Sequence, residues 1–195
     1  MASVRNRKES GTAERVLDIA ERLVQVRGFS NFSYADIATE LWITKASLHY
    51  HYAGKAELGQ ALITRYAERF NQALGEIDHD RPNARTKLVA YAELYAGVLR
   101  NERMCMCGIL AAEYQTLPHA MQSEVVRFFD DNQAWLTKML KEGKADGTLA
   151  YKGRAQDTAQ GILSTLEGAM LVARPYGTQA RFDAAVKQLL RGLTP

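Results

Sequence analysis

The segment between Glu40 and Glu57 carries hydrogen-bond donors and aromatic rings but no acidic residue. Two lysines, two histidines and two tyrosines lie in it, together with Thr44 and Ser47. Cationic groups and hydroxyls contact phosphate oxygens, and a side chain as short as serine can approach the edges of bases in a DNA groove. Since an acid-free run also avoids repelling the DNA backbone, these residue types predict nucleic-acid binding.

Two carboxylates are a second candidate for chemistry. Glu113 and Glu167 lie on or beside apolar stripes at helical spacing. A carboxylate in such a place needs a partner, because an unpaired buried charge is costly. We favour an arginine or a backbone donor across a helix contact as that partner, and a cationic or hydrogen-bonding ligand stays open.

Two thiols are the third candidate. Cys105 and Cys107 form a CxC pattern, whose short loop and helical geometry argue against a disulfide between them. As buried residues they would behave as small hydrophobic side chains, which is the interpretation we favour. An accessible thiolate near Arg103 would instead react with oxidants or electrophiles. With His119 the thiols offer three soft ligands, but their spacing matches no closed four-ligand metal site.

The elements that position the donor-rich segment begin with two helices. The first is predicted over about 12–27 and ends at Gly28. A second is predicted over about 34–41, where Ser33 offers a cap and Asp36 completes a weak capping box. The apolar stripe of the first helix consists of Val16, Ile19, Ala20, Leu23 and Val24.

A third short helix follows, capped by Thr44 and running through about Tyr50. Two short helices joined by a tight turn, the second bearing polar residues, fit a helix-turn-helix whose second helix enters a major groove. Leu48 would anchor this helix on Ile37 and Leu41.

Beyond Gly54 the pattern stays helical, and no segment alternates with the period of a strand. We therefore predict an all-α protein: an N-terminal three-helix helix-turn-helix unit, followed by a larger helical body. The later helices are predicted at roughly 55–75, 84–101, 104–116, 118–144, 155–174 and 178–192.

The succession RGFSNFSYADIATELWITKASLHYHYAGKAEL resembles the DNA-binding segment of the tetracycline-repressor (TetR) family of bacterial regulators, and the likeness covers about residues 12–60. The positions at family spacing are Gly28-Phe29, Ser33, Asp36-Ile37-Ala38, Thr44-Lys45, Leu48, His51-Tyr52, Lys55 and Glu57-Leu58.

This resemblance implies a homodimer that reads a palindromic double-stranded DNA operator and is released by a small-molecule effector. It divides the chain into residues 1–54, with an N-terminal arm and the DNA-binding domain, and residues 55–195, with a connecting helix and a domain for effector binding and dimerisation. The DNA contacts by family position are Thr44, Lys45, Ser47, His49, Tyr50 and Lys55, and Ser33 and Tyr34 at the start of the preceding helix complete the predicted set.

Two residues depart from the family's pattern. Trp42 stands in the turn where the family has glycine, and an aromatic residue in a left-handed conformation costs of order 1–3 kcal/mol. Either the turn is right-handed here or it is strained, and we expect the ring to pack over the short helices, with a reach toward DNA as the alternative. His49 stands where tyrosine is more usual, which makes pH-dependent DNA binding an expectation because imidazoles titrate near neutrality.

The body offers residues for an adaptable apolar pocket, although most of them are core by default. The candidate ligand-binding residues are Tyr91, Tyr95, Glu113, Tyr114, Phe128, Trp135, Met139, Glu167 and Met170. We assign the dimer interface to the last two helices, as is usual in the family, with small residues at Gly161, Thr165 and Gly168 and leucines at Leu189, Leu190 and Leu193.

The composition bounds the remaining choices. The net charge of +3 is mild, while residues 1–8 hold Arg5, Arg7 and Lys8 without an acid, which fits either an arm along phosphate or a plain solvated terminus. No apolar run approaches the roughly 20 residues of a membrane span, so we expect a cytoplasmic protein without membrane contact.

Three function classes remain in competition. A ligand-responsive dimeric repressor leads, with a thiol-based redox or electrophile sensor using Cys105 and Cys107 as its variant. A helical protein-interaction adaptor is the second class. An enzyme is the third and the weakest, because the chain has no phosphate-binding loop, metalloprotease motif or nucleophile elbow; we predict no catalytic residue, cofactor or metal.

Overall fold

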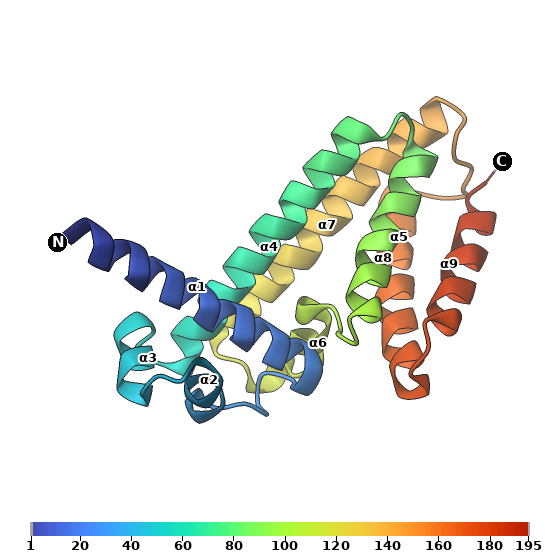
Figure 1. The fold of residues 1–195 in the computed structure, drawn as a ribbon. Coiled ribbons are helices and arrows are strands. Elements are labelled where there is room, and N and C mark those ends of the chain that lie inside the picture. Colours follow the sequence, from blue (N-terminus) through green and yellow to red (C-terminus); the bar gives the residue numbers. More distant parts are fainter. Residues whose placement is uncertain (1, 195) are drawn as a thin grey trace. The chain divides into compact units, whose positions relative to one another are not determined.

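The structure is a computed structural model that describes residues 2–194, with side chains described from residue 11 onward. The described residues form helices and no strand, which confirms the all-α prediction (Figure 1). The elements are α1 (Ala2–Arg27), α2 (Tyr34–Leu41), α3 (Lys45–His51), α4 (Lys55–Asp80), α5 (Ala84–Arg100), α6 (Met106–Ala112), η1 (Tyr114–Thr116), α7 (His119–Ala145), α8 (Ala155–Ala173), η2 (Arg174–Tyr176) and α9 (Ala180–Gly192).

The helix boundaries follow the caps read from the sequence. Ser33 precedes α2, Thr44 precedes α3, and α1 ends at Gly28, whose φ is +89°. The predicted start of the first helix at residue 12 is wrong, because α1 begins at Ala2. The side chains of the basic arm predicted for residues 1–8 lie outside the described residues.

The predicted helix at 104–116 is wrong in extent. It divides into α6 and the short 3-10 helix η1, with Glu113 between them at φ −98° and ψ 10°. Pro118 disfavours helical angles at the residue before it, so the helical stretch ends by Thr116. Leu117 accordingly has an extended backbone.

Packing divides the chain into two compact units. An N-terminal unit comprises Met1–Tyr66 and Met106–Val125, and a C-terminal unit comprises Ala67–Cys105 and Val126–Pro195. The division of the sequence at residue 54 was made by function and stays a prediction. Each unit is described by itself below.

In the N-terminal unit, α2 packs on α1 and α3 packs on α2. Val16, Ala20 and Val24 of the predicted α1 stripe are at most 1% exposed. Leu48 of α3 is equally buried, as expected of the residue that anchors the second helix of the motif. Apolar burial of this kind supplies about 25 cal/mol per Å² and holds short helices that would not persist alone.

Arg65 of α4 fastens α4 to α1 through three acids. Its Nη1 donates to Asp18 Oδ1 at 2.8 Å and to Glu14 Oε2 at 3.2 Å, and its Nη2 donates to Glu21 Oε2 at 3.0 Å. Glu21 is only 8% exposed, so the guanidinium supplies the partner that its buried charge requires.

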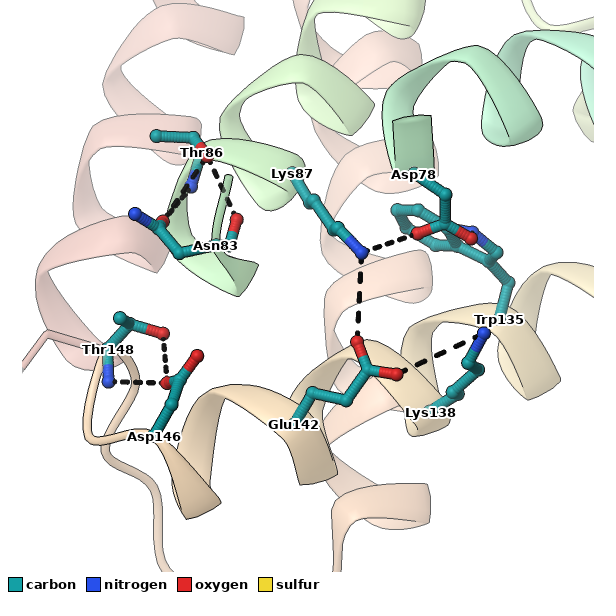
Figure 2. Close-up of polar contacts among 9 residues, drawn as sticks. All are labelled: Asp78, Asn83, Thr86, Lys87, Trp135, Lys138, Glu142, Asp146 and Thr148. Carbon is teal, nitrogen blue, oxygen red and sulfur yellow. Dashed lines mark hydrogen bonds and ion pairs between the residues drawn. The ribbon is translucent and has the colours of Figure 1, made fainter. Parts of the chain in front are cut away.

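In the C-terminal unit, α8 and α9 lie side by side and are joined through η2, and α5 packs against both (Figure 1). Asp78, near the end of α4, links this helix to α5 and α7 through hydrogen bonds. It accepts hydrogen bonds from Lys87 Nζ of α5 at 2.8 Å and from Trp135 Nε1 of α7 at 3.1 Å (Figure 2). Glu142 of α7 lies 3.7 Å from the same ammonium.

In the described part of the chain, no helix is both long and apolar enough to span a bilayer.

Replacing Arg65 by alanine should lower the free energy of unfolding by about 3 kcal/mol, because the buried Glu21 loses its ion pair with the guanidinium. Urea denaturation followed by circular dichroism measures this. Arg15→Ala, at an exposed position of α1, is the matched control and should change stability by less than about 0.5 kcal/mol. Equal effects of the two substitutions would show that the acid cluster does not stabilise the unit.

Candidate functional site

The α2–turn–α3 segment has the geometry of a helix-turn-helix. Thr44 Oγ1 accepts a hydrogen bond from Ser47 N at 3.2 Å, so the predicted cap of α3 is present. Ile43 N donates to Ala38 O at 3.0 Å and closes the turn on the end of α2. Because Leu41 and Leu48 are buried on either side of this turn, the backbone between them is fixed.

Four of the predicted DNA-binding residues present groups on the surface of α3. Lys45 and His49 are exposed, Ser47 is half-buried, and Tyr50 is 75% exposed. Lys45, Ser47 and Tyr50 offer an ammonium and two hydroxyls within six residues, the donor types that phosphate oxygens and base edges accept.

His49 uses one of its two ring nitrogens within the protein. Its Nδ1 lies 3.1 Å from Ala53 O, and because a carbonyl only accepts, Nδ1 carries the proton. Nε2 then accepts in the neutral ring and donates only in the imidazolium. A hydrogen bond from His49 Nε2 to a phosphate therefore needs the protonated ring, and pH-dependent DNA binding stays a prediction.

Ser33 and Tyr34 have their hydroxyl protons engaged inside the N-terminal unit. Ser33 donates to Asp36 Oδ2 from both N and Oγ, each at 2.7 Å, and these bonds lower the pKa of Asp36. Tyr34 donates to Tyr52 O at 3.0 Å, and partial burial, with nearby Glu57 and Tyr52, raises the pKa of Tyr34 to about 12. A DNA contact by either hydroxyl would compete with these bonds.

Lys55 also has an internal role that sequence reasoning missed. Its Nζ donates to Phe32 O at 2.5 Å and lies 4.3 Å from the centroid of the Phe32 ring and 4.8 Å from that of Phe29. Partial burial lowers the pKa of Lys55. The ammonium thus holds the loop between α1 and α2, with two further N–H donors for the predicted phosphate contact.

Trp42 corrects one expectation. The ring does not pack over the short helices, since the residue is 94% exposed. Its backbone is left-handed, with φ 56° and ψ 41°, so of the two alternatives drawn from the sequence the strained turn is the one observed. The side chain of this strained residue does not contribute to the hydrophobic core.

The structure brings four of the predicted ligand-binding residues together in the C-terminal unit. Tyr91 stacks on Trp135 with ring centroids 5.4 Å apart and planes at 20°, and it tilts against Tyr95 at 5.4 Å. Phe128 joins through Phe70, whose centroid lies 5.2 Å away. Met139 and Met170, from the same predicted set, are buried in this unit as well.

A buried amide, Asn132, belongs to this aromatic cluster and escaped the sequence analysis. Tyr91 Oη donates to Asn132 Oδ1 at 3.0 Å, and Asn132 Nδ2 donates to Phe128 O at 2.8 Å. The Tyr95 hydroxyl lies 3.1 Å from that of Tyr91. Its position in the helical repeat could have indicated its burial, because Asn132 falls four residues after Phe128 on an apolar helix face.

Glu167 is the acid of this unit that lacks full compensation. Within the described residues its Oε1 is buried without a hydrogen-bond partner. Burial raises the pKa of Glu167 to about 7, although a hydrogen bond with Cys105 opposes the shift. Burial is the main cause of the raised pKa of Tyr91 and of Tyr95, and the charge of Glu167 adds to both shifts. The carboxyl and the two phenols therefore share one neighbourhood.

Glu113 and Tyr114 complete the predicted ligand-binding set. Both belong to the N-terminal unit, where Glu113 Oε2 accepts from Ser30 N at 2.9 Å and from Ser30 Oγ at 3.1 Å. Glu113 thus has the backbone donor that we favoured as its partner, and its place in the ligand-binding set stays a prediction. The main-chain oxygen of Tyr114 accepts from Gln122 Nε2 at 2.9 Å.

The two cysteines form no disulfide and both are buried, Cys105 at 1% and Cys107 at 0% exposure. Both thiols are thus withdrawn from solvent, where an oxidant or electrophile would have to reach them. In the part of the chain that the structure describes, no three of its His, Cys, Asp and Glu side chains gather where a metal ion could be held.

Two family models match the chain. The model described as bacterial regulatory proteins, tetR family, matches residues 16–62, which include α2 and α3. The model described as tetracyclin repressor-like, C-terminal domain, matches residues 82–189. The first agrees with the resemblance found at about residues 12–60.

Individual proteins agree with these models. The crystal structure of a TetR-family transcriptional regulator from Agrobacterium tumefaciens is 31% identical, with a TM-score of 0.93, over 96% of this chain and 100% of that one. A TetR transcriptional regulator from Legionella pneumophila is 29% identical, with a TM-score of 0.85, over 93% and 96%. The HTH-type transcriptional repressor NemR of Escherichia coli K12 is 24% identical over 170 residues, 85% of each chain.

The raised pKa of Glu167 predicts how stability depends on pH. The folded protein keeps this proton up to about pH 7, whereas the unfolded chain releases it above about 4.5, so the free energy of unfolding falls as the pH rises between those values. Glu167→Gln should remove that fall and be more stable than the wild type at pH 8 by up to roughly 3 kcal/mol.

Urea denaturation from pH 4.5 to pH 8 measures this difference. Glu68→Gln, at an exposed position, is the control and should keep the wild-type profile. If the profiles of Glu167→Gln and the wild type run parallel, the carboxyl is not held neutral by burial.

Proposed function

The chain belongs to the TetR family of bacterial regulatory proteins, and from that premise we propose that it is a dimeric repressor released from a palindromic operator by a small-molecule effector. The relatives NemR and BepR are named transcriptional repressors, which supports repression over activation. The proposal gives the protein no catalytic role and places it in the cytoplasm with the DNA.

The observation that carries the proposal is the surface of α3. A seven-residue helix held by Leu48 presents Lys45, Ser47 and Tyr50 outward. Lys45 and Tyr50 are exposed and Ser47 is half-buried, so solvent reaches all three. Such a surface fits the major groove, where hydroxyls and cations meet base edges and phosphates.

For the effector we propose the neighbourhood of Glu167, Tyr91 and Tyr95. The orphan oxygen of Glu167 is a buried acceptor, and a bound cation or hydrogen-bond donor would satisfy it. Tyr91 and Trp135, which stack on each other, supply apolar aromatic surface for the rest of such a ligand. A small molecule with one positive or donor group on an apolar frame is the class that fits.

Connectivity supplies a route from this site to the DNA-binding unit. Cys105, which hydrogen-bonds Glu167, is followed directly by α6, and α6 leads to Glu113, whose carboxylate holds Ser30 between α1 and α2. A ligand that binds the Glu167 carboxyl would compete with its hydrogen bond to Cys105, the residue directly before α6. Coupling requires that the ligand favour one of two arrangements of α6.

For the dimer we propose the outer surface of α8 and α9. Leu171 and Val172 are 62% and 55% exposed, and a Cβ added at Gly161 or Gly168 would meet open space, so a second helix could approach closely. Leu193, which we had included in this interface, is only 6% exposed within its own chain and its main-chain oxygen accepts from Ala150 N. The interface therefore rests on the earlier residues.

The two alternatives gain less support. Thiol sensing needs an accessible thiolate, and the burial of both cysteines opposes it. An adaptor that binds protein alone gives no account of the solvent-facing donors of α3.

DNA binding is tested by a salt titration of the purified protein on the DNA flanking its own gene, in competition with random duplex. Selective binding that weakens steeply with salt is expected. Lys45→Ala should weaken it and lower the slope of log K against log salt by about 1 per protomer. Lys152→Ala, an exposed lysine of the C-terminal unit, should leave the slope unchanged.

No preference over random duplex, both for this DNA and for sequences selected from a random pool, would refute the regulator proposal and favour the adaptor. A full salt slope in Lys45→Ala would remove Lys45 from the phosphate contacts.

The dimer surface is tested by Leu171→Glu combined with Val172→Glu. Two buried carboxylates on each side of the interface should convert the dimer to monomer in sedimentation equilibrium while helix content is kept. Val126→Glu changes a 45% exposed valine of α7 and should leave the dimer intact. A dimer that survives the double substitution uses another surface.

A further inference from the structure

Trp42 is placed where the backbone favours glycine. It is the C-cap residue of α2, with φ 56° and ψ 41°, and its N–H bonds to Ala38 O and Thr39 O at the helix end. Glycine adopts these angles without cost, whereas a side chain with a Cβ is strained there. Among the described residues, Glu102 is the one other non-glycine residue with a positive φ.

Packing does not compensate for this strain. Burying an aromatic ring usually stabilises the fold, but Trp42 is 94% exposed and its ring lies in solvent. The chain's other tryptophan, Trp135, shows the ordinary arrangement, with its ring stacked on Tyr91 and its Nε1 bonded to Asp78. A strained backbone whose side chain gains no stabilisation from packing points to a role outside folding.

The surroundings indicate which partner this ring meets. Trp42 lies in the turn before α3, two residues before Thr44 and three before the exposed Lys45. No acid follows it until Glu57, and the acid that precedes it, Glu40, is paired with Arg22. A polyanion can therefore approach the ring without meeting an unpaired carboxylate on this segment.

We infer that Trp42 contacts the sugar–phosphate backbone of DNA beside the recognition helix. The ring covers apolar deoxyribose surface, and the indole Nε1–H, which can only donate, bonds to a phosphate oxygen. The inference rests on the proposed DNA-binding function. It adds a contact residue at a position where glycine would be unstrained but would offer no side chain to the DNA. Since a backbone contact carries no sequence information, Trp42 strengthens binding to operator and random duplex alike.

Three substitutions at position 42 separate the ring from the strain. Trp42→Gly and Trp42→Asn both suit a left-handed residue, so both should raise the urea midpoint of unfolding. Both should weaken binding to operator and to random duplex by about tenfold, the size of effect that aromatic contacts with nucleic acid show. Trp42→Phe keeps a ring and the strain but loses the donor, and it should weaken binding by a smaller factor without a gain in stability.

Glu102→Gly is the matched control, because it relieves the same backbone strain in the C-terminal unit. It should raise the urea midpoint and leave both DNA affinities unchanged. Fluorescence adds a direct readout. DNA should quench the wild-type emission more than that of Trp42→Phe, in which Trp135 is the remaining tryptophan.

The outcomes separate this inference from the proposal beneath it. Wild-type affinity in Trp42→Gly and Trp42→Asn, for operator and random duplex, would overturn the inference while leaving the regulator intact. A loss confined to the operator would also overturn it, since the contact would then read bases. Failure of the wild type itself to bind any duplex would sink the proposed function instead.

Discussion

The contact on which the N-terminal unit depends is the insertion of the Glu113 carboxylate at the loop between α1 and α2. It is possible because Gly28 has no side chain: a Cβ there would lie 2.1 Å from Glu113 Oε1. The same glycine ends α1 in a left-handed conformation, so one residue both turns the chain and admits the carboxylate. The loop is further held by the Lys55 ammonium on Phe32 O. Two charges from distant parts of the sequence thus hold the loop that leads into α2.

A second carboxylate, that of Glu167, is held under the opposite condition. Glu113 has two donors from Ser30, while Glu167 has a thiol and an orphan oxygen. The first is satisfied and stabilises its loop, whereas the second is destabilised when ionised and gains most from a ligand. On the proposed function the protein keeps a structural acid near the DNA-binding helices and a responsive acid among aromatic side chains.

Local signals in the sequence predicted most of the helices. Ser33, Thr44 and Gly28 act on neighbours within a few residues, so spacing alone placed α2, α3 and the end of α1. The misses arose where the deciding group lies far along the chain. The partners of Glu113 and Lys55 come from the α1–α2 loop, and no periodicity indicates such a pairing. Trp42 failed in another way: the sequence showed the conflict with its turn, but only the fold could show that its ring stays in solvent.

The raised pKa of Glu167 has a consequence for how the protein would respond in a cell. On the proposed function a cationic effector binds the ionised carboxylate, so its binding to the protonated carboxyl must release the proton. Effector and proton then compete for one oxygen, and acidification raises the effector concentration at which half of the protein is occupied. A repressor built in this way would integrate two signals through a single carboxyl group, and an acidified cell would keep its operator occupied at effector levels that release it at neutral pH.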